Sequence, residues 1–218
     1  AGLIEEARRI FDEITVKDVV SWNAIMSGYG DFGYFNEVLI LFEKMLSDNS
    51  IKPDSYTLVN VLSACDQLGE LNHGKWTHLY IERNQIPVTG FLATALVDMY
   101  SKCGEIIKAL KIFNKTLNKD VSTWNSVIGG LSINGYGQNA VKTFHEMLWS
   151  DCKPNEITFI NVRSSCSHTG LIQEGLKFFH QMISEHKIEP RLEHYGCVID
   201  LLSRAGLLLE AYELLKIV

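Results

Sequence analysis

The stretch DMYSKCGEIIKAL, residues 98–110, decides the fold, because it returns 102 residues later as DLLSRAGLLLEAY, residues 200–212. Two further pairs of segments keep nearly the same offset: SWN (21–23) with TWN (123–125), and SACDQLGELNHG (63–74) with SSCSHTGLIQEG (164–175). Similarity that keeps its register over three pairs is the signature of a repeat architecture. The sequence therefore predicts a tandem repeat whose pattern recurs every 101 or 102 residues.

One glycine marks each repeat. The series is Gly2, Gly33, Gly69, Gly104, Gly135, Gly170 and Gly206, with spacings of 31, 36, 35, 31, 35 and 36 residues. Five residues after each glycine a small side chain stands in six of the seven cases, and a larger side chain follows four residues later. Residues four apart lie on one face of a helix, and glycine is the least strained residue where the chain turns with a positive φ. We therefore expect two helices per repeat, an A helix before the glycine and a B helix after it.

The apolar pattern is helical throughout. In the first repeat one stripe consists of Leu3, Ala7, Ile10, Phe11 and Ile14, with Glu and Arg on the opposite face. No stretch sustains the period-two alternation of a half-buried strand. The expected fold is all-α, an α-solenoid with six A helices and seven B helices that begins and ends on a B helix.

The composition excludes several classes of protein. The chain has 218 residues, of which 46% are hydrophobic and 21% charged, and these are ordinary values for a folded protein. No stretch reaches the ~20 uncharged apolar residues that cross a bilayer. The formal net charge of −6 argues against a protein that binds phosphates mainly through bulk positive charge.

The cysteines and histidines give no sign of a catalytic or metal site. The five cysteines are Cys65, Cys103, Cys152, Cys166 and Cys197, and they contain no CxxC pair. This spacing argues against a disulfide framework and against a zinc ribbon. HExxH, GxSxG and the HxE with downstream CxxC of zinc deaminases are all absent from the sequence. We therefore expect no enzyme activity, no catalytic residue, no metal and no cofactor in this chain.

The repeats resemble a known family. VVSWNAIMSGY (19–29), SYTLVNVLSACDQLGELNHGKWTHLYI (55–81) and FLATALVDMYSKCGEIIKALKIF (91–113) resemble the P, L and S motifs of plant pentatricopeptide repeat (PPR) proteins of the PLS class. The resemblance implies a right-handed superhelix of tandem helix-turn-helix motifs, one array over 1–218. The expected division is a partial S motif at 1–18, P at 19–54, L at 55–89, S at 90–120, P at 121–155, an L-type motif at 156–191 and a truncated S-type motif at 192–218.

The resemblance also implies a function. Members are organellar RNA-binding proteins, commonly specificity factors for C-to-U RNA editing in the mitochondrion or chloroplast. The implied partners are single-stranded RNA and an RNA-editing cofactor protein, with no membrane. In this family the fifth and the last residue of a motif together contact one base, and we call these two residues the base-specifying pair. By position the pairs are Asn23 with Asp54, Thr94 with Asp120, and Asn125 with Asn155.

The chemistry of these pairs predicts an order of bases. A carboxylate only accepts hydrogen bonds, so Asp54 and Asp120 favour the imino N–H of U or G, whereas the Asn155 amide can donate to C or A. The longer Asn at the fifth place leaves room for a pyrimidine, and the shorter Thr for a purine. The three motifs therefore predict U, G and C, which gives 5′-U-N-G-C-3′ with the intervening L motif unassigned.

Residues at the second place of a motif sandwich the base in this family. By position they are Val20, Phe91 and Ser122, of which Ser122 departs from the usual apolar type. The L-type motifs carry Val59 and Ile160 at the fifth place. These side chains have no hydrogen-bonding group, so the pairing rule makes no prediction for them.

Few charges accompany these positions. The segments 19–29 and 121–132 contain none, which leaves Lys102, Arg163 and Arg204 as the candidate phosphate contacts. Each phosphate contact on a single strand contributes a salt slope of about −0.7. We therefore expect weak RNA binding with a shallow salt dependence.

Two alternatives stay open at this level. The acidic total and the uncharged A helices are also typical of a protein-interaction scaffold, in which the L motifs dock an editing cofactor or the truncated array self-associates through 207–218. Trp22 and Trp124 recur at one place inside the A helix, where packing in the core is favoured over stacking on bases.

Overall fold

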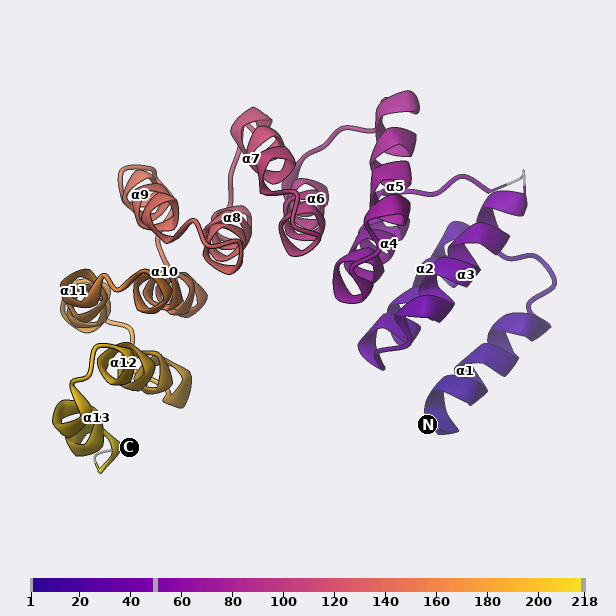
Figure 1. Ribbon diagram of the computed structural model, residues 1–218. Helices are drawn as coiled ribbons and strands as arrows, with labels where there is room; N and C mark the ends of the chain where they lie inside the picture. The colour runs from indigo at the N-terminus through magenta and orange to yellow at the C-terminus, as the bar shows by residue number, and fades with distance from the viewer. Residues whose placement is uncertain (1, 49–50, 217–218) are drawn as a thin grey trace. The chain divides into compact units, whose positions relative to one another are not determined.

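The computed structural model describes residues 2–48 and 51–216, and over these ranges the chain forms thirteen α-helices and no strand. The chain divides into two bodies, one up to Glu105 and one from Ile106. Figure 1 labels the helices of both. The first body contains α1 (Gly2–Glu13), α2 (Val19–Asp31), α3 (Phe35–Ser47), α4 (Ser55–Leu68), α5 (Leu71–Arg83) and α6 (Gly90–Lys102). The second contains α7 (Ile106–Lys115), α8 (Val121–Ile133), α9 (Gly137–Leu148), α10 (Glu156–Thr169), α11 (Ile172–Ser184), α12 (Leu192–Arg204) and α13 (Leu208–Leu215).

Within each body the helices stack as tandem hairpins. In the first body α2 packs on α3 and on the next A helix, α4, which in turn packs on α5 and α6. In the second body α8 packs on α9 and α10, and α10 on α11 and α12. Within a body, α2, α4, α8 and α10 thus each contact their own B helix and the A helix of the following motif. The predicted all-α repeat solenoid is confirmed, and so are the six A helices and seven B helices over the described residues.

The A helices begin at the expected places. They start at residues 19, 55, 90, 121, 156 and 192, the first residues of the six motifs that follow the partial one. At four of these starts the preceding Asp or Asn side chain accepts a hydrogen bond from the backbone N–H three residues on, which satisfies one of the free donors of the first turn. The assignment of each motif to the P, L or S type stays a prediction.

Glycines make the A-to-B turns. Gly69 and Gly170 cap α4 and α10 in the left-handed region, with φ of 69° and 70°. The glycines at 33, 104, 135 and 206 have φ between 77° and 80°. A side chain would strain this conformation, which explains why the glycine returns in every repeat.

The two tryptophans of the super-repeat lie in the core. Trp22 and Trp124 are 6% and 7% exposed. Each packs edge-to-face on the phenylalanine of the preceding B helix, with ring centroids 4.9 Å apart for Phe11 and Trp22 and 4.9 Å for Phe113 and Trp124. The prediction that these rings pack in the core is confirmed, and the contact repeats at an offset of 102 residues.

Small residues on the B helices allow close approach of the next A helix. A Cβ at Gly74 of α5 would lie 2.4 Å from Met99 Sδ of α6, and one at Gly175 of α11 would lie 2.5 Å from Leu201 Cδ2 of α12. The small-residue position found in the sequence is therefore a helix-packing position. Among the described helices, none has the length and apolar character needed to cross a membrane.

Candidate nucleic-acid interface

The last residue of a motif is the N-cap of the next A helix. Oδ1 of Asp54 accepts the Thr57 backbone N–H at 2.9 Å, and Oδ1 of Asn155 accepts the Thr158 N–H at 3.1 Å. In both cases the threonine hydroxyl receives the N–H of the capping residue, at 3.2 Å from Asp54 N and 3.0 Å from Asn155 N. This capping box fixes Oδ1 of the last residue. The other terminal atom of that side chain, Oδ2 of Asp54 or Nδ2 of Asn155, is directed away from the helix.

The first predicted base-specifying pair meets in the structure. Asn23 of α2 and Asp54 are 31 residues apart in sequence, and Nδ2 of Asn23 donates to Oδ1 of Asp54 at 3.0 Å. The hydroxyl of Thr57 lies 2.7 Å from Oδ1 of Asn23. Both members of the pair are partly buried, so each keeps some access to solvent.

The second pair repeats this arrangement in the other body. Nδ2 of Asn125 donates to Oδ1 of Asn155 at 3.0 Å, and the Thr158 hydroxyl lies 2.6 Å from Oδ1 of Asn125. Asn155 is partly exposed, whereas Asn125 is only 8% exposed. Asn125 is therefore more enclosed than Asn23, its counterpart at the first site.

The two sites differ in the atom that is left available. Over residues 2–48 and 51–216, the side-chain hydrogen bonds of Asp54 and Asn155 with Asn23, Thr57, Asn125 and Thr158 all end on Oδ1, which leaves Oδ2 of Asp54 and Nδ2 of Asn155 outside this network. The Tyr56 N–H also stabilises the Asp54 carboxylate. Partial burial acts to raise the pKa of Asp54, but hydrogen bonds from Thr57 N–H and the Asn23 amide outweigh it and lower the pKa below its ordinary value. Asp54 is therefore ionised at neutral pH. The first site offers a carboxylate acceptor where the second offers an amide donor.

Thr94 and Asp120 belong to different bodies. Thr94 is partly buried in α6 and its hydroxyl lies 3.4 Å from the carbonyl oxygen of Gly90. Asp120 is exposed and caps α8, where its Oδ1 accepts the Thr123 N–H at 2.8 Å. Their pairing stays a prediction.

The predicted sandwich residues are exposed. Val20 is 67% exposed, Phe91 is 48% exposed, and Ser122 is also at the surface. Tyr56, the second residue of the 55–89 motif, stacks on Phe91 with ring centroids 5.1 Å apart and an angle of 26° between the planes. The sequence analysis did not single out Tyr56, although its place in the motif marks it as the counterpart of Val20.

One predicted phosphate contact is wrong. Arg163 is fully buried in α10, where Nη2 donates to the carbonyl oxygen of His194 at 2.6 Å and the guanidinium lies 4.6 Å from the centre of the Phe179 ring. A side chain enclosed in this way has no access to a phosphate. The prediction fails because a place on an A helix does not by itself put a charged side chain at the surface. The Arg163 side chain points between α10, α11 and α12.

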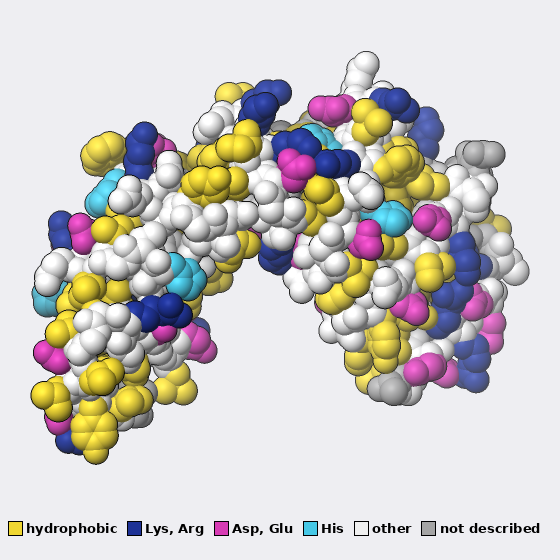
Figure 2. Space-filling view, in the orientation of Figure 1, with side chains coloured by type: hydrophobic (Ala, Val, Ile, Leu, Met, Phe, Trp, Pro, Cys, Tyr) yellow, Lys and Arg dark blue, Asp and Glu magenta, His cyan; other side chains and the backbone are white. Residues whose placement is uncertain are grey.

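The other two candidate cations take part in ion pairs. Nζ of Lys102 lies 3.0 Å from Oδ1 of Asp66, and Nε of Arg204 lies 2.9 Å from Oδ1 of Asp200. Lysine and arginine side chains are interspersed with acidic ones over the face shown in Figure 2. The described surface in this view thus carries no continuous basic patch.

The structure adds polar residues that the sequence analysis missed. Thr57 and Thr158 contact the fifth-place asparagines, and Nδ2 of Asn60 and Asn161 lies 3.4 Å and 3.0 Å from the backbone oxygens of those same asparagines. The signal was present in the sequence, because these two threonines and two asparagines recur at an offset of 101 residues.

Cys65 and Cys166 are buried in the core, and the other three cysteines are partly buried. Burial raises the pKa of the Cys65 and Cys166 thiols to about 12, so both stay protonated at neutral pH. All five cysteines are free. In the described part of the chain, no cluster of three or more His, Cys, Asp or Glu side chains is placed to hold a metal ion.

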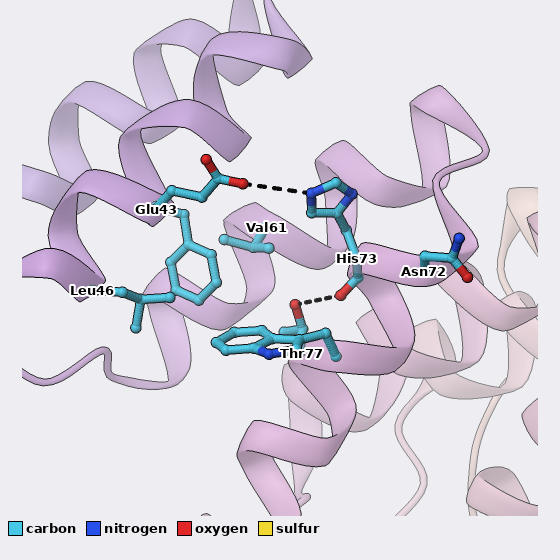
Figure 3. Close-up of a pocket in the computed structure, with 8 residues that line it drawn as sticks. Glu43, Leu46, Val61, Asn72, His73 and Thr77 are labelled. Atoms are coloured by element: carbon cyan, nitrogen blue, oxygen red, sulfur yellow. Dashed lines mark hydrogen bonds and ion pairs between the residues drawn. The ribbon is translucent and has the colours of Figure 1, made fainter.

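A separate pocket of about 310 Å³ lies between α3, α4 and α5. Its walls are mainly apolar, with Phe42, Leu46 and Val61 beside Trp76, which is 47% exposed. At the rim Oε1 of Glu43 lies 3.7 Å from Nε2 of His73, and Figure 3 shows these two side chains facing one another. None of the predicted base-specifying residues lines this pocket.

The chain matches known proteins over nearly its whole length. A model described as "PPR repeat family" matches residues 17–66 and 119–162, and one described as "PPR repeat" matches 91–121, 164–186 and 193–217. Three relatives come from Arabidopsis thaliana. They are pentatricopeptide repeat-containing protein At4g38010 (48% identical over 98% of this chain and 38% of the relative), At5g19020, mitochondrial (43%, 99% and 32%), and DOT4, chloroplastic (40%, 99% and 25%). The chain thus spans less than two fifths of the length of these three relatives.

Solved structures share the fold. The crystal structure of PPR10 from maize matches 95% of this chain and 31% of its own, with a TM-score of 0.68 and 22% identity. PPR10 in complex with an 18-nt psaJ RNA element matches 98% of this chain and 42% of its own, with a TM-score of 0.57 and 18% identity. With two repeat models covering most of its residues and its helices stacked as tandem hairpins, this chain belongs to the pentatricopeptide repeat family.

Proposed function

We propose that this chain binds single-stranded RNA and contacts one base with the base-specifying pair of each P and S motif. The observation that supports the proposal most strongly is the meeting of Asn23 with Asp54 and of Asn125 with Asn155, at 3.0 Å in both cases. A family relative of the same fold, PPR10, has been crystallised with an RNA element. The chain would act by positioning and not by catalysis.

The available atoms suggest which base each pair selects. At the 19–54 motif, the second hydrogen of Asn23 Nδ2 is a donor and Oδ2 of Asp54 is an acceptor, which complements a carbonyl oxygen and the imino N–H of U. At the 121–155 motif, Asn125 and Asn155 each offer an amide hydrogen, which complements the neighbouring O2 and N3 acceptors of C. The Thr94 and Asp120 pair is assigned to G. The proposed order is 5′-U-N-G-C-3′.

A binding titration with substituted RNAs tests this function. Fluorescence anisotropy is measured for a short unpaired RNA that contains UNGC, for the single substitutions U to C, G to C and C to U, and for a scrambled RNA of the same composition. Each substitution is expected to weaken binding, and the scrambled RNA to bind weakest. Unchanged affinity when G is exchanged for C at the third place contradicts the proposed base order.

The finer role is proposed from the family resemblance. As part of a longer PPR protein, the array would guide C-to-U RNA editing at a site in an organellar transcript, with an editing cofactor protein as partner. Relatives carry the designations mitochondrial and chloroplastic, which supports an organellar location. Sequencing of organellar transcripts from a plant that lacks the parent gene tests this role, because one or more editing sites are then expected to stay unedited.

A second candidate function is docking of a protein at the pocket between α3, α4 and α5. The observation in its favour is the exposed Trp76 beside an apolar cavity in the 55–89 motif, whose fifth residue, Val59, has no hydrogen-bonding group. Equal affinity for matched and scrambled RNA, or no binding of either, favours this scaffold function. If RNA binding is the function, Trp76→Ala is expected to leave the affinity for matched RNA within about twofold, because the pocket lies apart from the base-specifying pairs.

A further inference from the structure

We infer that Thr57 and Thr158 are positioning residues, which fix the orientation of the base-contacting amide of the preceding motif. Both stand at the third place of an L-type motif, 34 and 33 residues after the asparagines that they contact. Their role in base selection rests on the proposed function. Their role in orienting the amide rests on the contacts alone.

The contacts at the first site permit one orientation of the Asn23 amide. The Asp54 carboxylate accepts but does not donate, so the group that faces it must be the amide nitrogen, at 3.0 Å. The Thr57 oxygen already accepts the Asp54 N–H at 3.2 Å. Its hydroxyl lies 2.7 Å from Oδ1 of Asn23 and 3.0 Å from Oδ1 of Asp54, so the shorter of the two contacts is with the amide oxygen. The hydroxyl therefore engages the amide oxygen and leaves an N–H of Asn23 for the base.

The second site depends on its threonine more strongly. Asn155 carries an amide in place of a carboxylate, but its Oδ1 is fixed by the Thr158 backbone N–H at 3.1 Å, so its Nδ2 points away. The Thr158 hydroxyl at 2.6 Å from Oδ1 of Asn125 completes the network. Thr158 is fully buried, so water cannot replace its hydroxyl as the donor.

The L-type helices also hold the backbone of the contacted residue. Nδ2 of Asn161 donates to the carbonyl oxygen of Asn125 at 3.0 Å. The equivalent hydrogen bond at the first site, from Nδ2 of Asn60 to the carbonyl oxygen of Asn23, is longer, at 3.4 Å. Gly129 of α8 leaves space for this contact, since a Cβ there would lie 3.1 Å from Asn161 Nδ2. The L-type motifs, whose own fifth residues are apolar, thus complete the base-specifying sites of the P motifs before them.

Loss of the hydroxyl is expected to free the amide. Without it, the Asn125 amide is held at its nitrogen alone, by Oδ1 of Asn155, so it can move away from the position in which its N–H meets C. The preference for C over U at the fourth RNA position should then fall by about fivefold, the value of one hydrogen bond. Thr158→Ser keeps the hydroxyl and should keep the preference.

Ser21 provides a control for the loss of a hydroxyl at the third place of an A helix. It stands at the third place of α2, and its hydroxyl contacts Oδ1 of Asp18 at 2.5 Å, but the described residues show no contact with a fifth-place amide. Ser21→Ala therefore removes a hydroxyl that contacts the capping residue, as the Val variants do, without changing a base-specifying pair.

The experiment compares Thr158→Val, Thr158→Ser, Thr57→Val and Ser21→Ala by two measurements. In the RNA-free protein, ¹⁵N relaxation of the side-chain amides of Asn23 and Asn125 should show increased mobility in each Val variant at its own site, rescue by Ser and no change in Ser21→Ala. In the RNA titration, Thr158→Val should lower the ratio of affinities for C and U.

An Asn125 amide as rigid in Thr158→Val as in the wild type overturns the inference. If Thr158→Val does not fold, the mobility of the Asn23 amide in Thr57→Val decides the same question at the first site. Wild-type protein that does not distinguish C from U refutes the proposed function, while the relaxation data still decide the positioning role.

Discussion

Leu62 and Arg163 hold the same place in motifs that are 101 residues apart, and both side chains are fully buried. Burial lowers the pKa of Arg163 to about 10, and among the described residues its Nε and Nη1 have no hydrogen-bond partner. The second body therefore carries a guanidinium without a carboxylate partner at a place where the first body has leucine. Removing a buried ionic group in favour of an apolar side chain of suitable size often stabilises a protein.

We expect Arg163→Leu to raise the free energy of unfolding by about 1–4 kcal/mol. Urea denaturation followed by circular dichroism measures this change. Leu62→Ala serves as the reference for how much a buried leucine at this position contributes to stability. It should lower the free energy of unfolding by about 2–5 kcal/mol. A lower stability for Arg163→Leu would mean that the contacts with His194 and Phe179 outweigh the cost of burying the charge.

His194 makes stability depend on pH. It is fully buried at the start of α12, where Nδ1 accepts the Arg191 N–H at 3.0 Å and Nε2 lies 3.3 Å from the carbonyl oxygen of Glu156. Burial lowers the pKa of His194, and the charge of Arg163 acts in the same direction. Because the folded state binds the proton less readily than the unfolded state, stability is complete above the unfolded pKa of about 6.5 and falls as the pH drops below it.

We therefore expect the urea midpoint of the wild type to fall between pH 7.5 and pH 5.5 by more than that of His194→Asn, whose side-chain oxygen accepts the same N–H without titrating. His180→Asn, at an exposed histidine, should follow the wild type. Identical pH profiles for the wild type and His194→Asn would show that this histidine does not cause the loss of stability at acidic pH.

Two helical glycines should respond in opposite directions to alanine. A Cβ at Gly137 would lie 2.8 Å from the Ser165 backbone oxygen and 2.3 Å from Thr169 Cγ2, whereas one at Gly196 has nothing within 4 Å. Gly137→Ala should cost about 1–3 kcal/mol through overpacking. Gly196→Ala should gain up to about 1 kcal/mol through helix propensity. Thermal unfolding of both variants checks this, and equal shifts in the melting temperature would contradict the close approach of α9 and α10.

The stacked rings of Tyr56 and Phe91 should contribute affinity without selecting a base. Stacking on an aromatic ring depends little on base identity, so Phe91→Ala is expected to weaken binding of every RNA by about 1–3 kcal/mol. The ratios between matched and substituted RNAs should stay the same. Trp149→Ala, which removes an 85% exposed aromatic ring at the end of α9, should leave the affinity unchanged. Anisotropy titrations measure both, and a change of base preference in Phe91→Ala would assign this ring a selective role.

Most of the fold follows from the sequence, because the same helix-turn-helix pattern, marked by its glycine, recurs seven times. The glycine series and the apolar stripes locate the helices, and place in the motif brings Asn23 to Asp54 and Asn125 to Asn155. The errors concern side-chain direction, which depends on packing between helices of different motifs. Arg163 is a core residue like its counterpart Leu62 and not a surface residue. The hydroxyls of Thr57 and Thr158 contact amides that lie more than 30 residues away in the sequence.

The most direct test of base selection is a reciprocal exchange of the two capping residues, Asp54→Asn and Asn155→Asp. Asn and Asp are equally good N-caps, so both helix starts are preserved while donor and acceptor change places. The account predicts that the preference at the first RNA position moves from U to C and that at the fourth from C to U, by about fivefold or more in the ratio of affinities. Base preferences that stay the same in the doubly substituted protein would contradict it.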